Sequence, residues 1–218
     1  MHPYLEVCIA RMIVGPPIEY RIGVTGAQAG TLSFLVGGTE ASFLQAQPTL
    51  ELMGRRIIHC GSSGAGLGAK ICNNLVLGVQ QIVVGEAMLL GRQLGLEPAI
   101  LAGVINSSTG SCWASSVNNP VPTSLPDKSP PCEKDYEGGF ATALMLKVGR
   151  CSVAVGVKTD LLCQDMELAM NIAKDGRSAL PLGKASRDIY EEVVRRRPEL
   201  GKKDFSCVYV HLKDLSAG

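Results

Sequence analysis

The hydrophobic period of an α-helix runs through nearly all of the chain after Ser62, and this feature constrains the fold most. Its clearest instance is GAGLGAKICNNLVLG (residues 64–78), which leads into a longer apolar stretch. We expect one helix that begins between Gly64 and Lys70 and ends near Gly95, packed by at least three further helices. Its apolar residues share one helical face: Ile71, Leu75, Ile82 and Leu89. Further helical patterns cover 98–109, 140–147, 165–175 and 183–198.

The first sixty residues instead mix strand and helix patterns. TLSFLVGG (Thr31–Gly38) alternates and ends in a glycine pair, which predicts a strand and a turn. Glu40–Met53 has a helical pattern, and RRIIHCG (Arg55–Gly61) predicts a second strand. We therefore expect a mainly α fold with a small α/β unit in residues 1–61 and a helical domain in residues 62–218. The β structure should be confined to the first sixty residues.

Composition argues against several classes of protein. The formal net charge of +1 and the 46% share of hydrophobic residues predict neither a nucleic-acid-binding surface nor a disordered chain. The densest apolar run, residues 75–90, is interrupted by Gln80, Gln81 and Glu86. Because a membrane span needs about 18 consecutive apolar residues, we expect this run to be a core helix and predict no membrane partner.

The eight cysteines form no C-x-x-C pair and no cluster with histidines. This spacing predicts free thiols, rather than a disulfide framework or a metal site. The N-terminal residues MHPYLEVCIARMIVGPP have neither the pattern of a signal peptide nor an amphipathic Arg/Ser pattern. No targeting segment is therefore predicted from them.

Three polar side chains stand near the start of the long helix. Lys70, Asn73 and Asn74 occupy positions i, i+3 and i+4, which lie on one helical face. The positive end of the helix dipole disfavours an ammonium group at Lys70, which suits a group that must accept a proton. An exposed lysine at the start of a helix is the alternative. Gly78 and Gly85, farther along, weaken a helix, so we expect another backbone to pass close to them.

These residues resemble a motif of the β-hydroxyacid dehydrogenase family, G-x-x-G-x-G-x-x-x-K-x-x-x-N. Gly61, Gly64, Gly66, Lys70 and Asn74 fill it in register. Other segments are similar to the 3-hydroxyisobutyrate dehydrogenases in particular: GVTGAQAGTLSFLVGG (23–38), INSSTGSCWASSVNNPVP (105–122) and YEGGFATALMLK (136–147). The resemblance implies a helical domain like the C-terminal domain of 6-phosphogluconate dehydrogenase, preceded by a remnant of an NAD-binding Rossmann domain.

The resemblance also implies roles for individual residues. A hydroxy acid would lose a hydride to NAD, with NADP as the alternative cofactor. Lys70 would take the hydroxyl proton and Asn74 would orient the lysine or the substrate; both are the expected catalytic residues. Gly23, Asn73 and Lys147 are the expected substrate-binding residues. Lys147 and Asp165 would lie near the nicotinamide, and no metal is expected.

The chain departs from the family pattern at three places. Residues 1–22 match nothing in the family and contain no glycine-rich loop, and Arg21 and Ile22 occupy the places of a serine and a glycine. Residues 148–164 separate Lys147 from Asp165, which are adjacent in the family. We expect this insert to loop out of a helix. These departures predict that the chain is a truncated, incompletely spliced or wrongly assigned product of a dehydrogenase gene, and that it is inactive.

The resemblance implies oxidation of 3-hydroxyisobutyrate to methylmalonate semialdehyde, a step of valine catabolism, by an NAD-dependent enzyme. One alternative is a glyoxylate or succinic-semialdehyde reductase of the same family. Another is a helical dimerisation module without catalytic activity. The expected partners are a small hydroxy acid and a second copy of the chain, in mitochondria by resemblance and otherwise in the cytoplasm.

Overall fold

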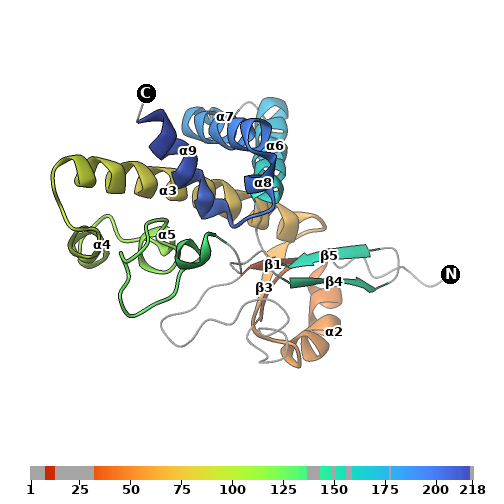
Figure 1. The fold of residues 1–218 in the computed structure, drawn as a ribbon. Helices are drawn as coiled ribbons and strands as arrows, with labels where there is room; N and C mark the ends of the chain where they lie inside the picture. Colours follow the sequence, from red (N-terminus) through yellow and green to blue (C-terminus); the bar gives the residue numbers. More distant parts are fainter. Residues whose placement is uncertain are drawn as a thin grey trace. The chain divides into compact units, whose positions relative to one another are not determined.

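A computed structural model describes residues 8–12, 32–136, 143–148, 151–155, 159–176 and 178–216 of the chain (Figure 1). The chain divides into two compact units, Met1–Asn73 and Asn74–Gly218. Helices predominate in the second unit, whereas the first contains a small sheet. The predicted fold class, mainly α with a small α/β part at the N-terminal side, is therefore confirmed. Gly23 and the other residues of 13–31 lie outside the described residues.

The first unit is built on three strands and one helix. β2 (Leu32–Gly37) lies between β1 (Cys8–Met12), which runs antiparallel to it, and β3 (Gly54–Gly61), which runs parallel to it. The helix α2 (Glu40–Glu51) connects the two parallel strands, and the side chain of Thr39 caps its N-terminus. The predicted strands at 31–38 and 55–61 and the helix between them are confirmed.

The long helix α3 (Ala65–Gln93) begins within the predicted interval and ends close to the predicted residue. Its first turn packs closely against the end of β2. A Cβ atom at Gly66 would stand only 2.5 Å from the carbonyl oxygen of Leu35, and one at Gly37 only 2.8 Å from that of Ser62. Glycine at these positions therefore lets two backbones approach as no other residue would.

The second unit packs helices α6 (Thr159–Asp175), α7 (Pro181–Arg196) and α9 (Val208–Leu215) with α3. The remaining elements are α4 (Pro98–Ser107), α5 (Trp113–Ser116), η1 (Pro131–Lys134), α8 (Pro198–Gly201) and η2 (Phe205–Cys207). The largest core cluster includes Ile82, Leu162, Met166, Tyr190 and Phe205. The prediction that at least three helices pack on the long helix is consistent with this cluster.

Gly78 and Gly85 of α3 face side chains, so the prediction of a nearby backbone was wrong. A Cβ atom at Gly78 would stand 2.8 Å from Sδ of Met166, and one at Gly85 would stand 3.1 Å from Cδ1 of Leu212. The glycines therefore make room for bulky residues of α6 and α9. The sequence indicates that space is needed but does not reveal which atoms fill it.

A second, two-stranded sheet shows that the prediction of β structure confined to the first sixty residues was wrong, and it contradicts two further predictions. β4 (Ala143–Val148) pairs antiparallel with β5 (Cys151–Val155), where we expected a helix followed by a looped-out insert. Cross-strand pairing with the Val-rich segment outweighs the local helical period at 140–147. The end of the supposed insert is also helical, because α6 begins at Thr159, before Asp165.

A buried polar cluster joins the segment before η1 to the start of η2. The carboxylate Oδ1 of Asp204 accepts hydrogen bonds from Nδ2 of Asn118 (3.0 Å) and from the backbone N (3.0 Å) and Oγ (2.6 Å) of Ser206. Gln81 of α3 donates from Nε2 to the carbonyl oxygen of Asn118 at 3.2 Å. All four of these side chains are buried, and the cluster stabilises the irregular stretch between α5 and η1.

By length and composition alone, α3 is apolar enough to cross a membrane. A core helix of a globular protein passes the same test. Here the helix places Ile82 and Met88 in buried clusters and buries the polar side chains of Asn74 and Gln81. These contacts support the prediction that α3 is a core helix.

Candidate functional site

The expected catalytic residues lie together on the first part of α3. Lys70 and Asn73 are half-buried, and Asn74, one turn after Lys70, is 5% exposed. The spacing of four residues places Lys70 and Asn74 next to each other on one helical face. Both residues therefore belong to one continuous helix, at the spacing that the sequence motif predicts.

Asn74 is held from a second helix. Its Nδ2 atom donates a hydrogen bond of 2.6 Å to Oδ2 of Asp165, which is half-buried on α6. Hydrogen bonds to a carboxylate are shorter and stronger than those between neutral groups. The two residues are 91 positions apart in the sequence, and neither local periodicity nor motif spacing gave a signal for this contact. It is the part of the site that the sequence analysis missed.

The other expected site residues are not gathered in the same way. Lys147 lies in β4 and Asp165 lies in α6, so the two do not follow each other along one helix. This separation agrees with the expectation that residues 148–164 keep Lys147 and Asp165 from being neighbours on one helical turn. Gly23 lies outside the described residues.

The buried thiols do not offer a nucleophile. Burial is the main cause that raises the pKa of both Cys132 and Cys207 to about 12. A thiolate is the reactive form, and neither group reaches it near neutral pH. Within the described residues, no group of three or more His, Cys, Asp or Glu side chains could hold a metal ion.

Comparisons with known proteins agree with the motif. Residues 64–150 match a family model described as NAD-binding of NADP-dependent 3-hydroxyisobutyrate dehydrogenase. Residues 22–61 match a model described as the NAD binding domain of 6-phosphogluconate dehydrogenase. The chain is 42% identical over 191 residues to the mitochondrial 3-hydroxyisobutyrate dehydrogenase of Drosophila melanogaster, covering 88% of this chain and 52% of that protein. The chain belongs to the 3-hydroxyisobutyrate dehydrogenase family.

Bacterial relatives support the same assignment. A probable 3-hydroxyisobutyrate dehydrogenase of Mycobacterium tuberculosis is 42% identical over 186 residues, which is 85% of this chain and 56% of that protein. A solved structure of the 3-hydroxyisobutyrate dehydrogenase of M. tuberculosis with L-serine superimposes with a TM-score of 0.73 at 40% identity. That alignment covers 87% of this chain and 58% of the solved one. The chain thus spans about half the length of the curated relatives it matches.

Proposed function

We propose that these residues belong to an NAD-dependent dehydrogenase that oxidises 3-hydroxyisobutyrate, or a related short 3-hydroxy acid, with Lys70 as the acid–base group. One observation supports this most: Lys70 and Asn74 stand one turn apart on α3, in register with the family motif. NADP is the alternative cofactor. The product would be methylmalonate semialdehyde, and valine catabolism the process.

The side chains fit a reaction in which the substrate hydroxyl loses its proton. A bound nicotinamide cofactor would supply the hydride acceptor. Lys70 accepts the hydroxyl proton, or donates a hydrogen bond to the oxygen as negative charge develops there. Asn74 supplies an amide that holds the lysine or the hydroxyl in place, and misplacement of about 1 Å is enough to slow such a step about a hundredfold.

The expected binding residues complete the proposal. Gly23, Asn73 and Lys147 would contact the substrate, and Lys147 with Asp165 would lie on the nicotinamide side, as the family resemblance implies. The 218 residues contain no G-x-G-x-x-G loop, so we assign no residue to the pyrophosphate. Among the described residues, nothing lies within 4 Å of a Cβ added at Gly64 or Gly68, near the start of α3. That space is compatible with a small molecule close to the backbone.

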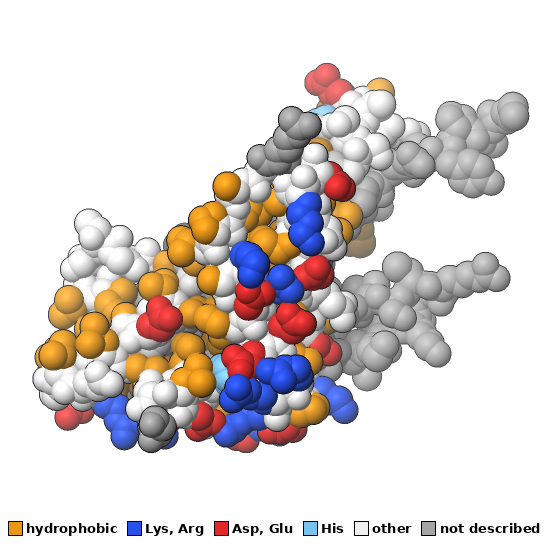
Figure 2. All heavy atoms as spheres, turned by 90° about the horizontal axis from the view of Figure 1, so that it is seen from above, with side chains coloured by type: hydrophobic (Ala, Val, Ile, Leu, Met, Phe, Trp, Pro, Cys, Tyr) orange, Lys and Arg blue, Asp and Glu red, His pale blue; other side chains and the backbone are white. Residues whose placement is uncertain are grey.

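A non-catalytic role as a dimerising helical module is the second candidate. Large apolar side chains are exposed along α3, α4 and the turn between them in the second unit: Val76, Val83, Leu90, Leu94, Ile100 and Val104. Figure 2 shows hydrophobic side chains gathered at the end formed by these two helices. An apolar face of this kind favours self-association, so we propose a homo-oligomer in either case. For the compartment we propose mitochondria, because several eukaryotic relatives are named mitochondrial.

The test is NADH formation at 340 nm with 3-hydroxyisobutyrate, run beside the reduction of glyoxylate and of succinic semialdehyde. It is made on the 218-residue chain and on the protein expressed from the complete coding sequence of its gene. We expect the 218 residues alone to be inactive, and 3-hydroxyisobutyrate to be preferred wherever activity is found. Preference for the two aldehydes would support the reductase, whereas a dimer that is inactive in both forms would support the non-catalytic module.

A further inference from the structure

Asp165 has a structural partner that the family resemblance does not assign to it. Its Oδ2 atom accepts the 2.6 Å hydrogen bond from Nδ2 of Asn74, and both residues belong to the second compact unit. Asn74 is almost completely buried, whereas Asp165 is half-buried. A buried amide has to be hydrogen-bonded, but a neutral acceptor would be sufficient for that purpose. The use of a carboxylate has a further consequence for the amide.

An ionised carboxylate only accepts hydrogen bonds, so it selects one of the two orientations of the Asn74 amide. The NH2 group must face Asp165, and the carbonyl oxygen Oδ1 is therefore turned away from it. A hydroxyl, which both donates and accepts, would leave both orientations open, whereas a backbone carbonyl would select the same orientation through a weaker, uncharged hydrogen bond. Asp165 thus fixes which way round the amide of Asn74 lies, and Asn74 is the residue that the proposed mechanism places beside the substrate.

The selected orientation matters because of Lys70. An ammonium group only donates hydrogen bonds, so Oδ1 of Asn74 could accept from it, whereas Nδ2 could not. With the amide reversed, two sets of donors would face each other between positions 70 and 74. The short hydrogen bond to Asp165 therefore favours the arrangement in which a lysine one turn away has an acceptor.

We propose that Asp165 is a positioning residue, which fixes the amide of Asn74 so that its carbonyl oxygen serves Lys70 or the substrate hydroxyl. The proposal rests on the proposed function and refines it. It gives Asp165 a role through Asn74, in place of direct contact with the cofactor. Loss of Asp165 should then slow the chemical step and leave the affinity for NAD unchanged.

The test is a double-mutant cycle in the protein expressed from the complete coding sequence. Asn74→Ala and Asp165→Ala should each lower kcat about 10- to 100-fold, as expected when an aligned group is misplaced. The double variant should be no slower than the slower single variant, because both changes remove the same alignment. Losses that multiply, or a raised KM for NAD at unchanged kcat in Asp165→Ala, would overturn the proposal.

Conservative variants separate alignment from packing. Asp165→Asn keeps an acceptor but allows both amide orientations, so kcat should fall between those of the wild type and Asp165→Ala. Gln164→Ala, exposed on the same helix, and Glu199→Gln, an exposed carboxylate on α8, are the matched controls, and their kcat should equal that of the wild type. Asp165→Asn as slow as Asp165→Ala, with an equal loss of melting temperature, would indicate a packing role and refute positioning.

A second measurement does not depend on activity. The side-chain NH2 group of Asn74, assigned by NMR, should exchange slowly with water in the wild type and at least about tenfold faster in Asp165→Asn and Asp165→Ala, since each loses the charge-assisted hydrogen bond. Equal exchange in all three proteins would refute the positioning role. Slow wild-type exchange in a protein that oxidises no hydroxy acid would refute the proposed function and leave the pairing of Asn74 and Asp165 intact.

Discussion

Replacing Gly66 by Ala would place a methyl group between the first turn of α3 and the end of β2. The added Cβ would stand 2.5 Å from the carbonyl oxygen of Leu35 and 3.0 Å from the backbone N of Gly37. Both neighbours are backbone atoms of the sheet and have no rotamer by which to move away. The helix or the strand has to shift, which disturbs the parallel pairing of β2 with β3.

Gly68, two residues later in the same helix, is the matched control. No atom of the residues that the structure describes lies within 4 Å of an added Cβ there, and its backbone N already donates to the carbonyl oxygen of Gly64 at 3.0 Å. Gly68→Ala should therefore stabilise the protein by up to about 1 kcal/mol through helix propensity. Gly66→Ala gains the same propensity but suffers an overpacking cost of about 1–3 kcal/mol, for which the backbone contacts indicate the upper half of the range.

The two substitutions should consequently act with opposite signs. In urea denaturation, the free energy of unfolding of Gly66→Ala should be about 1–2 kcal/mol lower than that of the wild type, which is the overpacking cost minus the gain in helix propensity. The free energy of unfolding of Gly68→Ala should be higher than that of the wild type. Circular dichroism at 222 nm monitors the transition, and melting temperatures should separate in the same order. A Gly66→Ala variant as stable as the wild type would show that α3 does not approach β2 so closely. A destabilised Gly68→Ala variant would contradict the open space beside that glycine.

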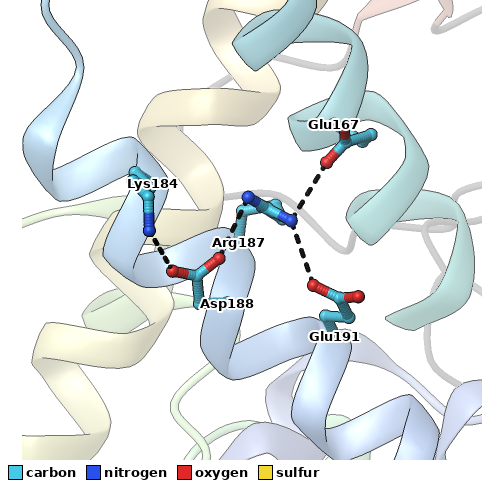
Figure 3. Close-up of polar contacts among 5 residues, drawn as sticks. All are labelled: Glu167, Lys184, Arg187, Asp188 and Glu191. Atoms are coloured by element: carbon cyan, nitrogen blue, oxygen red, sulfur yellow. Dashed lines mark hydrogen bonds and ion pairs between the residues drawn. The ribbon is translucent and has the colours of Figure 1, made fainter.

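Other features of the second unit give two further predictions. In Figure 3 Arg187 of α7 forms ion pairs with Glu167 of α6 and with two acidic neighbours on its own helix, so Arg187→Met should cost about 1 kcal/mol in unfolding free energy, less at high salt. As a comparison, Lys184→Met, which removes an exposed ion pair, should change the unfolding free energy by less than about 0.5 kcal/mol. The buried thiols of Cys132 and Cys207 have a pKa raised from 9.0 to about 12, so the unfolded state ionises first and stability should fall as the pH rises from 9 toward 12. In urea titrations, Cys132→Ala should make the unfolding free energy decrease less steeply between pH 9 and pH 12. An unchanged pH dependence would contradict the raised pKa of this thiol.

Long periodic segments were predictable because their burial follows from local spacing. Ile71 and Ile82, two residues of the predicted stripe, are buried in α3, and the helix begins within the glycine-rich stretch. The strands β2 and β3 were predicted from the alternation and glycine pair of Thr31–Gly38 and from the apolar run of Arg55–Gly61. In each of these cases a single element carries its own pattern.

Contacts between distant elements were not predictable. The pairing of β4 with β5 depends on a partner strand, and the helical period of residues 140–147 gives no sign of it. The hydrogen bond between Asn74 and Asp165 joins helices from separate parts of the chain. The sequence supplies the chemistry of each side chain at the site, whereas the packing of α3 with α6 decides which side chains meet.

The turnover of a Lys70→Ala variant is the most direct test of the proposed function. In the protein expressed from the complete coding sequence, kcat for NAD-dependent oxidation of 3-hydroxyisobutyrate should fall by about two to four orders of magnitude, as expected for loss of a general acid–base group. The affinity for NAD should change little, and added small alkylamines should restore part of the rate, because they replace the missing amine. A loss below about tenfold, without rescue by amines, would mean that Lys70 is only a residue at the start of a helix.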